Sequence, residues 1–244
     1  MLAVGSLAFA DDAAKTKVTD AIAKLKAADN YAWTVTTVNP NAQNPPAAIK
    51  GKTSKDGYIW TTSEGMNGPV DTVTKGTVSA NNRGGDWAAA RGGRGGRGGG
   101  GRGGRGGAAA PAAPATEADT LLKLAKDITA GDAGLFSGDY TDEGASAQAL
   151  ASGGRGGRGG GGGGGGGAAP TAKNAKGSVK FWVKDGMLVK YTSQVKGTVV
   201  AEGQDDRPVD VTRTTEIAGV GSTKFEIPAA AKAIVDAPPA APQN

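Results

Sequence analysis

From residue 178 to residue 227, apolar side chains recur at every second position, which is the spacing of a β-strand with one covered face. Turn residues divide this stretch into four predicted strands, at residues 178–184, 188–200, 209–217 and 223–227. The predicted covered face carries Val179, Phe181, Val183, Val189, Tyr191, Val195, Val209, Val211, Ile217, Phe225 and Ile227. The opposite face carries Lys180, Lys184, Lys190, Lys196, Asp210, Thr212 and Glu216. The pattern predicts an antiparallel meander with one buried face and one face exposed to solvent.

The N-terminal part of the chain shows the same strand period in shorter pieces. Further strands are predicted at residues 31–38, 50–55, 58–62, 70–74, 77–80 and 135–140. Asp56-Gly57 and Lys75-Gly76 favour tight turns, which would join the four middle segments as two hairpins.

Helical periodicity is found in three internal segments and at the C-terminal end. Apolar residues at spacings of three and four predict helices over residues 15–30, 117–128 and 141–150. Thr116 is expected to cap the second helix together with Asp119, and Thr141 to cap the third. Pro228 at a first helical position predicts a short helix that ends at residue 235. Together these elements predict an α+β fold, an antiparallel β half-barrel with helices packed on its concave face.

Two stretches rich in arginine and glycine interrupt these elements. Most of the 43 glycines lie within residues 83–107 and 153–167. Because such segments cannot bury enough apolar surface to offset the entropy of ordering, they predict disordered loops. We therefore predict one domain over residues 11–235, with disordered insertions at residues 83–115 and 151–175 and a disordered tail at residues 236–244.

The same stretches hold the excess of positive charge. All but two of the arginines lie in them, beside a single acidic residue, Asp86, so the rest of the chain is slightly acidic although the net charge is +5. Any binding of polyanions would therefore depend on the insertion arginines. These candidates are Arg91, Arg94, Arg97, Arg102, Arg105, Arg155 and Arg158. The repeats contain no Phe or Tyr that could stack on bases, so an anionic envelope surface is favoured over nucleic acid. A low-complexity expansion without a ligand, in a surface loop that tolerates it, is favoured over both.

Catalysis is constrained by what the composition lacks. The chain has no histidine and no cysteine, which removes thiol nucleophiles, imidazole bases and the commonest transition-metal ligands. The adjacent pair Asp205-Asp206 lies in a predicted turn and is not arranged as an acid–base couple. We predict that the protein is not an enzyme and binds no cofactor or metal.

The first ten residues indicate export. An apolar run ends in Ala8-Phe9-Ala10, a small-x-small pattern typical of signal-peptide cleavage, so residues 1–10 are predicted to be the remnant of a signal peptide. No segment has the length and apolarity of a transmembrane helix. A periplasmic or secreted location is expected.

The C-terminal third contains a W-V-x-D-G-x-x-x-K hairpin, long strands after it, and a terminal G-x-x-x-x-x-x-P edge. The residues of these motifs are Trp182, Val183, Asp185, Gly186, Lys190, Gly221 and Pro228. On these residues the segment resembles bacterial envelope proteins of the LolA/LppX type. This resemblance implies a carrier-type envelope protein that holds a lipid against the sheet.

The large aromatic residues on the predicted strands are the candidate ligand contacts. They are Trp33, Tyr58, Trp60, Phe181, Tyr191 and Phe225. If helices cover them fully they form ordinary core, and if the half-barrel is partly open they line an apolar pocket for a lipid or other amphiphile. The two alternatives to such a carrier are a polyanion binder that acts through the insertion arginines and a structural envelope protein without a ligand. The sequence leaves the oligomeric state open.

Overall fold

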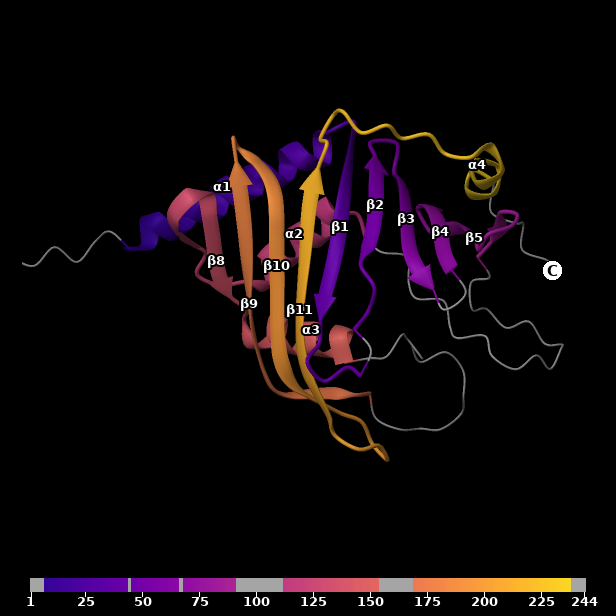
Figure 1. The fold of residues 1–244 in the computed structure, drawn as a ribbon. Helices are drawn as coiled ribbons and strands as arrows, with labels where there is room; N and C mark the ends of the chain where they lie inside the picture. The colour runs from indigo at the N-terminus through magenta and orange to yellow at the C-terminus, as the bar shows by residue number, and fades with distance from the viewer. Residues whose placement is uncertain (1–6, 44, 66–67, 91–111, 154–168, 238–244) are drawn as a thin grey trace, which may run out of the picture.

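The computed structural model describes residues 7–43, 45–65, 68–90, 112–153 and 169–237. Its strands form one antiparallel sheet in the order β6-β5-β4-β3-β2-β1-β11-β10-β9-β8-β7, with β6 and β7 at unpaired edges (Figure 1). The strands are β1 (Asn30–Val38), β2 (Ile49–Ser54), β3 (Tyr58–Gly65), β4 (Gly68–Lys75), β5 (Val78–Asn82), β6 (Ala88–Ala89), β7 (Thr129–Ala130), β8 (Leu135–Asp139), β9 (Thr171–Lys184), β10 (Met187–Val200) and β11 (Arg207–Ala218). The predicted open half-barrel is confirmed.

Three helices cover the concave face of the sheet. These are α1 (Leu7–Ala27), α2 (Pro114–Leu124) and α3 (Asp142–Gly153), which all lie behind β9, β10, β11 and β1 in Figure 1. Helices α1 and α2 pack against each other, and α3 lies across β9, β10 and β11. A short 3-10 turn, η1 (Asp132–Gly134), precedes β8.

Strand β1 joins the two halves of the sheet because it pairs with β11 on one side and β2 on the other. Trp33 of β1 lies opposite Ile217 of β11 and Gly51 of β2. By alternation, this register places Tyr31, Trp33 and Val35 on the concave face, where they are buried in the main core. Their helix partners include Val18, Ala21, Ile22 and Leu25 of α1 and Ala118, Leu121 and Leu122 of α2.

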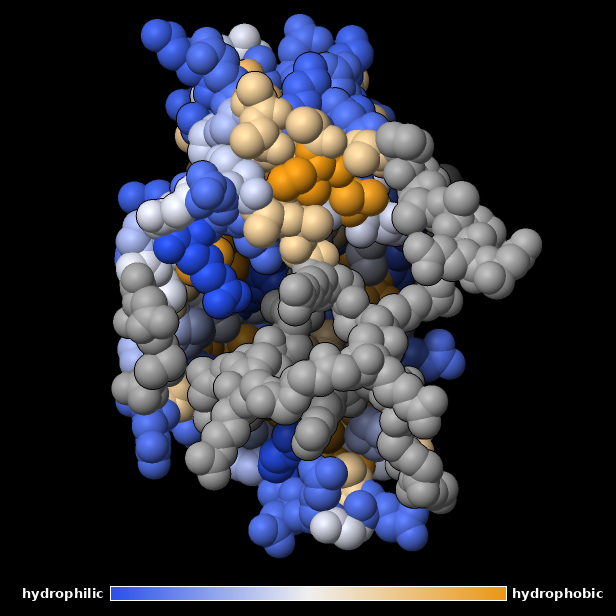
Figure 2. All heavy atoms as spheres, turned by 90° about the vertical axis from the view of Figure 1, so that its right-hand side faces the viewer, coloured by the Kyte–Doolittle hydropathy of each residue, from blue (hydrophilic) through white to orange (hydrophobic). Residues whose placement is uncertain are grey.

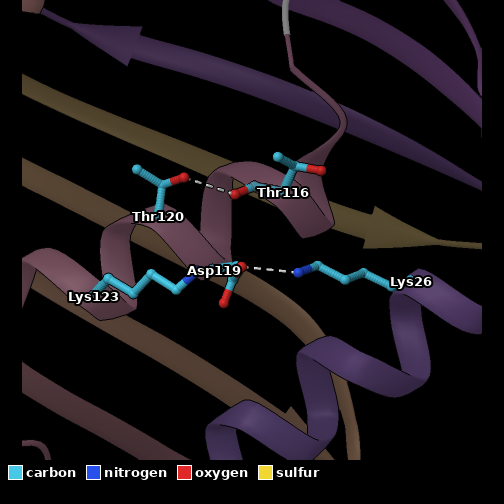
Figure 3. Close-up of polar contacts among 5 residues, drawn as sticks. All are labelled: Lys26, Thr116, Asp119, Thr120 and Lys123. Atoms are coloured by element: carbon cyan, nitrogen blue, oxygen red, sulfur yellow. Dashed lines mark hydrogen bonds and ion pairs between the residues drawn. The ribbon is translucent and has the colours of Figure 1, made fainter.

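The second helix differs from its prediction in extent and in capping. It begins at Pro114, and the residue before it, Ala113, makes no side-chain cap. Thr116 does not cap: its carbonyl accepts a hydrogen bond from Thr120 Oγ1 at 3.0 Å. Asp119, expected near the cap, instead binds Lys26 of α1 at 2.9 Å and Lys123 at 3.1 Å (Figure 3). The third helix does use its predicted cap, since Thr141 Oγ1 accepts from the Gly144 amide at 3.0 Å.

The predicted fourth strand of the C-terminal meander, at residues 223–227, is absent. After β11, Gly219 and Gly221 adopt φ of +59° and +72°, values that turn the chain away from the sheet. Asn30 then holds the departing chain, because its carbonyl accepts from the Gly221 amide and its side chain accepts from the Thr223 amide, both at 2.8 Å. The segment runs over the strand ends to α4 (Ala229–Val235), as Figure 1 shows.

The meander also contains a register shift that the alternation of apolar residues does not predict. Pairing between β9 and β10 slips between Leu188 and Lys190. Leu188 is therefore fully buried in the core, and Val189, which was predicted to lie on the covered face, is not part of it. On the opposite face the predicted charged residues pair across strands, with Lys190–Glu216 at 3.1 Å and Lys196–Asp210 at 2.9 Å.

Some residues of the segments that were predicted to be disordered belong to helices or strands. Strand β6 and the first residues of α2 lie within residues 83–115, and the ends of α3 and β9 lie within residues 151–175. Asp236, assigned to the tail, is bonded to two side chains of the sheet. Helix α1 begins at Leu7, inside the predicted signal segment.

A second core lies on the opposite, convex face of the sheet. Trp60, Val73 and Ala80 lie opposite one another on β3, β4 and β5, one position out of phase with the concave-face residues. Helix α4 covers them through Ala231 and Val235. Figure 2 shows the apolar side chains that gather over α4 at this end of the molecule.

Gly51 allows Trp33 to lie across β2, and we expect its replacement to be costly. A Cβ atom at residue 51 would lie 2.2 Å from two atoms of the Trp33 ring. Gly51→Ala should lower the free energy of unfolding by about 1–3 kcal/mol through overpacking, as measured by urea denaturation. In Gly85→Ala the new methyl meets nothing within 4 Å, so this control should change the same quantity by less than about 0.5 kcal/mol. Equal losses in the two variants would contradict the proposed role of Gly51.

Asp236 holds α4 against the sheet, and its contribution should depend on pH. Its carboxylate lies 2.8 Å from Lys75 Nζ and 2.7 Å from the Tyr58 hydroxyl. The hydrogen bond from Lys75, and then that from Tyr58, lowers the pKa of Asp236 below its ordinary value. The contribution is therefore complete at neutral pH and is lost as the pH falls through the lowered pKa.

Asp236→Asn should consequently speed hydrogen exchange of the α4 amides at neutral pH. The difference from the wild type should shrink as both proteins are acidified. Asp205→Asn, in the exposed turn between β10 and β11, serves as the control and should leave exchange in α4 unchanged. A difference that persists at acidic pH would show that the charge of Asp236 does not hold the helix.

Candidate functional site

The six predicted aromatic contacts fall on two faces of the sheet. Trp33, Phe181 and Tyr191 lie on the concave face beneath the helices, with 3%, 0% and 1% of their surface exposed. The rings of Phe181 and Tyr191 lie 6.5 Å apart between centroids. Side chains therefore fill this part of the concave face, and these three residues are core.

The other three aromatic residues belong to the convex core under α4. Tyr58 and Trp60 project from β3, and Phe225 reaches the same cluster from the segment between β11 and α4. Trp87, which the sequence analysis did not select, packs edge-on against Trp60 with ring centroids 6.4 Å apart. The predicted set is thus divided between two cores. Trp33 and Trp60 nevertheless line one cavity of about 400 Å³ over β1, β2 and β3, and the six residues together do not form one pocket.

The concave face is open farther along β10 and β11, beside α3. A cavity of about 430 Å³ lies between these strands, the first turn of α2, the C-terminal half of α3 and the loop after β1. Its lining residues are Thr37, Asn39, Ala42, Pro46, Glu117, Gln148, Ala151, Ser152, Ser193, Val195, Val211 and Arg213. A second cavity of about 550 Å³ shares Asn39, Ala42, Ser152 and Val211 with the first and extends to Gly153, Arg207, Pro208 and Val209. We call the two together the concave cleft.

Short side chains on α3 leave the space for this cleft. The helix contains no residue larger than Leu150, and its buried positions are Gly144, Ala145 and Ala149. Its last residue, Gly153, approaches the sheet so closely that a Cβ there would lie 2.6 Å from Val199. The helix end therefore contacts the sheet, while Ala151 and Ser152 beside it line open space.

The deep end of the cleft contains a charged network. Arg213 of β11 projects from the concave face and lies 3.4 Å from Glu117, which stands in the first turn of α2. Glu117 also accepts a 2.7 Å hydrogen bond from the Tyr191 hydroxyl. Burial, and then the negative charge of Glu117, raises the pKa of Tyr191 well above its ordinary value. The network thus pairs one cation with one anion and keeps the phenol neutral.

Arg213 is the functional residue that the sequence analysis missed. It shares the strand parity of Val209, Val211 and Ile217, so it occupies a position of the predicted covered face. A charged residue at a predicted buried position could have indicated a site, because a buried charge requires an ion-pair partner or a ligand.

The described residues offer few groups for other chemistry. Among them, no cluster of three acidic residues is arranged to hold a metal ion. No helix in the described ranges is long and apolar enough to span a membrane. The arginines proposed for polyanion binding, within residues 91–105 and 155–158, lie outside the described residues.

Comparisons with known proteins return similarity at the level of structure. No protein-family model matches the chain, and no curated protein matches it. The crystal structure of LprF from Mycobacterium bovis is similar over 90% of this chain and 98% of its own, with a TM-score of 0.44 and 12% identity. That of the Mycobacterium tuberculosis lipoprotein LppX is similar over 88% of this chain and 98% of its own, with a TM-score of 0.46 and 9% identity.

The second of these proteins, LppX, is one of the two for which the LolA/LppX type is named.

Burial of the tyrosines should be visible in an alkaline titration. Burial raises the pKa of Tyr140 to about 12 and that of Tyr191 well above the ordinary value of 10.0. Because the folded state favours the neutral phenols, this stability is complete below the unfolded-state pKa and is lost as the pH rises through the folded-state values. The ultraviolet absorbance of tyrosinate at about pH 11 should therefore show at least two of the four tyrosines un-ionised in the native protein and all four ionising in urea. Native and denatured curves that coincide would contradict this assignment.

Proposed function

We propose that the chain is an exported, non-catalytic envelope protein that holds one lipid or other amphiphile in the concave cleft. The observation that carries this proposal is the cleft itself, which lies on the helix-covered face and combines a valine-lined wall with polar residues. Its two parts, about 430 and 550 Å³, fall within the range typical of small-molecule sites. The fully buried aromatic residues deeper under α1 and α2 are scaffold in this proposal, and the ligand lies beside them.

The mixed lining favours an amphiphile over a purely apolar ligand. Val195 and Val211 form one wall, while Gln148, Ser152 and Ser193 present amide and hydroxyl groups to the same space. A wholly apolar ligand would leave these polar groups without solvent or partners, which costs free energy. A molecule with one polar end and one apolar part satisfies both kinds of surface.

Export is part of the same proposal. Cleavage after Ala10 would remove the start of α1 and retain the residues from Ala14 to Leu25 that α1 contributes to the main core within the described side chains.

Filling the cleft tests the proposal. Protein purified from its native host should release an amphiphile on solvent extraction, with a matching mass difference in native mass spectrometry. Ala151→Trp should weaken rebinding of a fluorescent fatty acid by about tenfold or more, because the indole would occupy the cleft.

The matched control is Ala23→Trp, an exposed position of α1 that does not line the cleft. It should bind the probe like the wild type, and the two variants should have similar melting temperatures. Absence of both extracted amphiphile and probe binding in the wild type would refute the proposal. Equal binding by the two tryptophan variants would place the ligand elsewhere.

A further inference from the structure

Arginine is distributed unevenly over the domain. Two arginines lie outside the glycine-rich stretches, Arg207 and Arg213, and both line the concave cleft. No lysine of the described chain lines it, and Glu117 is the one acidic residue among its lining. The cleft is therefore net positive within a domain that is otherwise slightly acidic. The guanidinium group suits planar oxyanions because it presents paired donors at fixed geometry.

Arg213 has N–H donors that no described residue uses and that a ligand could bind. A guanidinium carries five N–H groups, and the acceptor that the described residues provide is Glu117, at 3.4 Å from one terminal nitrogen. The Arg213 Nε atom is buried and has no hydrogen-bond partner among the described residues. Meanwhile 37% of the side chain is exposed, and the residue lines the cleft. An acceptor that enters from the cleft would meet the exposed part of this side chain, while Nε stays covered.

Glu117 balances the charge of Arg213 but uses few of its donors. The second carboxylate oxygen of Glu117 already accepts the Tyr191 hydroxyl at 2.7 Å, which leaves the 3.4 Å contact as its link to Arg213. The carboxylate therefore orients the guanidinium from one side and leaves the cleft side open.

Neutral donors surround Arg213 on the sheet. In the strand register, Ser193 of β10 and Thr37 of β1 lie directly opposite it, and both line the cleft. Ser193 accepts a hydrogen bond from the Tyr140 hydroxyl at 2.7 Å, so its own hydrogen can be donated. An oxyanion beside Arg213 would meet hydroxyl groups on both neighbouring strands.

An apolar path leads away from this point along β11. Val211 and Val209 follow Arg213 on the same face, and Val195 of β10 lies opposite Val211. The path ends at Arg207, six residues or about 20 Å from Arg213. From one end to the other the cleft thus presents the guanidinium of Arg213 beside Glu117, then a row of valines, and then a second arginine.

We propose that Arg213 binds the oxyanion headgroup, a carboxylate or a phosphate, of a single-chain amphiphile whose acyl chain lies over Val211 and Val209. This inference rests on the proposed function and adds the class of ligand that the cleft selects. Arg207, at the other end, attracts the anion electrostatically and does not hold it.

Matched ligands and matched variants test the assignment. The ligands are palmitate, 1-palmitoyl lysophosphatidic acid and 1-monopalmitoylglycerol, which share one acyl chain and differ in their headgroups. Affinities are measured on delipidated full-length protein by displacement of a fluorescent fatty alcohol, whose headgroup is uncharged. The variants are Arg213→Gln, Arg213→Lys and Arg207→Gln.

The wild type should bind at least one of the two anionic ligands about tenfold or more tighter than monopalmitoylglycerol, and comparison of the two acids identifies the oxyanion. Arg213→Gln should remove this preference, and Arg213→Lys, which keeps the charge but loses the fork of donors, should recover part of it. Arg207→Gln removes the same charge and should retain the preference within about threefold, because the ligand does not hydrogen-bond to it. If Arg213→Gln does not fold, the partial loss in Arg213→Lys carries the test.

Four outcomes would overturn the inference. Equal affinity for all three ligands in the wild type would leave the proposed function intact and refute the oxyanion site. Equal losses in Arg207→Gln and Arg213→Gln would show general attraction by charge and not a headgroup contact. Displacement of palmitate by inorganic phosphate at comparable concentrations would show a site for small anions. Failure of the wild type to bind any of these ligands or the probe would refute the proposed function as well.

Discussion

The contact between Trp33 and Gly51 holds the two halves of this sheet together. Strand β1 is the only connection in the described sheet between the long strands β9–β11 and the short hairpins β2–β5, and Trp33 lies at its centre. Its indole crosses β2 where residue 51 has no side chain, and its Nε1 donates to Thr53 at 3.0 Å. Because the same ring belongs to the core with α1 and α2, one side chain takes part in both the helix layer and the junction of the half-sheets.

The sheet is unusual in having a core on each face. Helices α1, α2 and α3 cover the concave side over β8–β11 and β1, whereas α4 covers the convex side over β4 and β5. A strand therefore buries opposite sets of residues depending on its place in the order: β1 buries Trp33 on the concave face, and β3 buries Tyr58 on the convex face. This division explains why the six aromatic residues, which share a strand pattern, belong to two different cores.

The elements that could be predicted from the sequence are those whose local pattern agrees with their tertiary environment. The hairpin at Asp56-Gly57, strand β8 and the Thr141 cap follow from turn and cap chemistry alone. Phe225 could not be placed, because alternation over five residues does not reveal that Gly219 and Gly221 turn the chain away from the sheet. The shift at Leu188 depends on pairing with β9, and the position of Asp119 depends on Lys26, 93 residues away. For the cleft, the sequence shows that Arg213 lies on the covered face of its strand. The sequence does not show that α3 lies beside this position and leaves a cavity there.

The path of the chain from β11 to α4 has a consequence for the order in which the protein can fold. Strand β1 is paired on both sides only when β11 is present. The convex core of β3–β5 is covered only when residues 225–236 are present. Both closures join residues 30–82 to residues 207–236, so the entropy of closing a very long loop opposes them. The full sheet and its convex core can therefore form only after residues 207–236 have been synthesised, and until then the edge of β1 that pairs with β11 lies open to other strands.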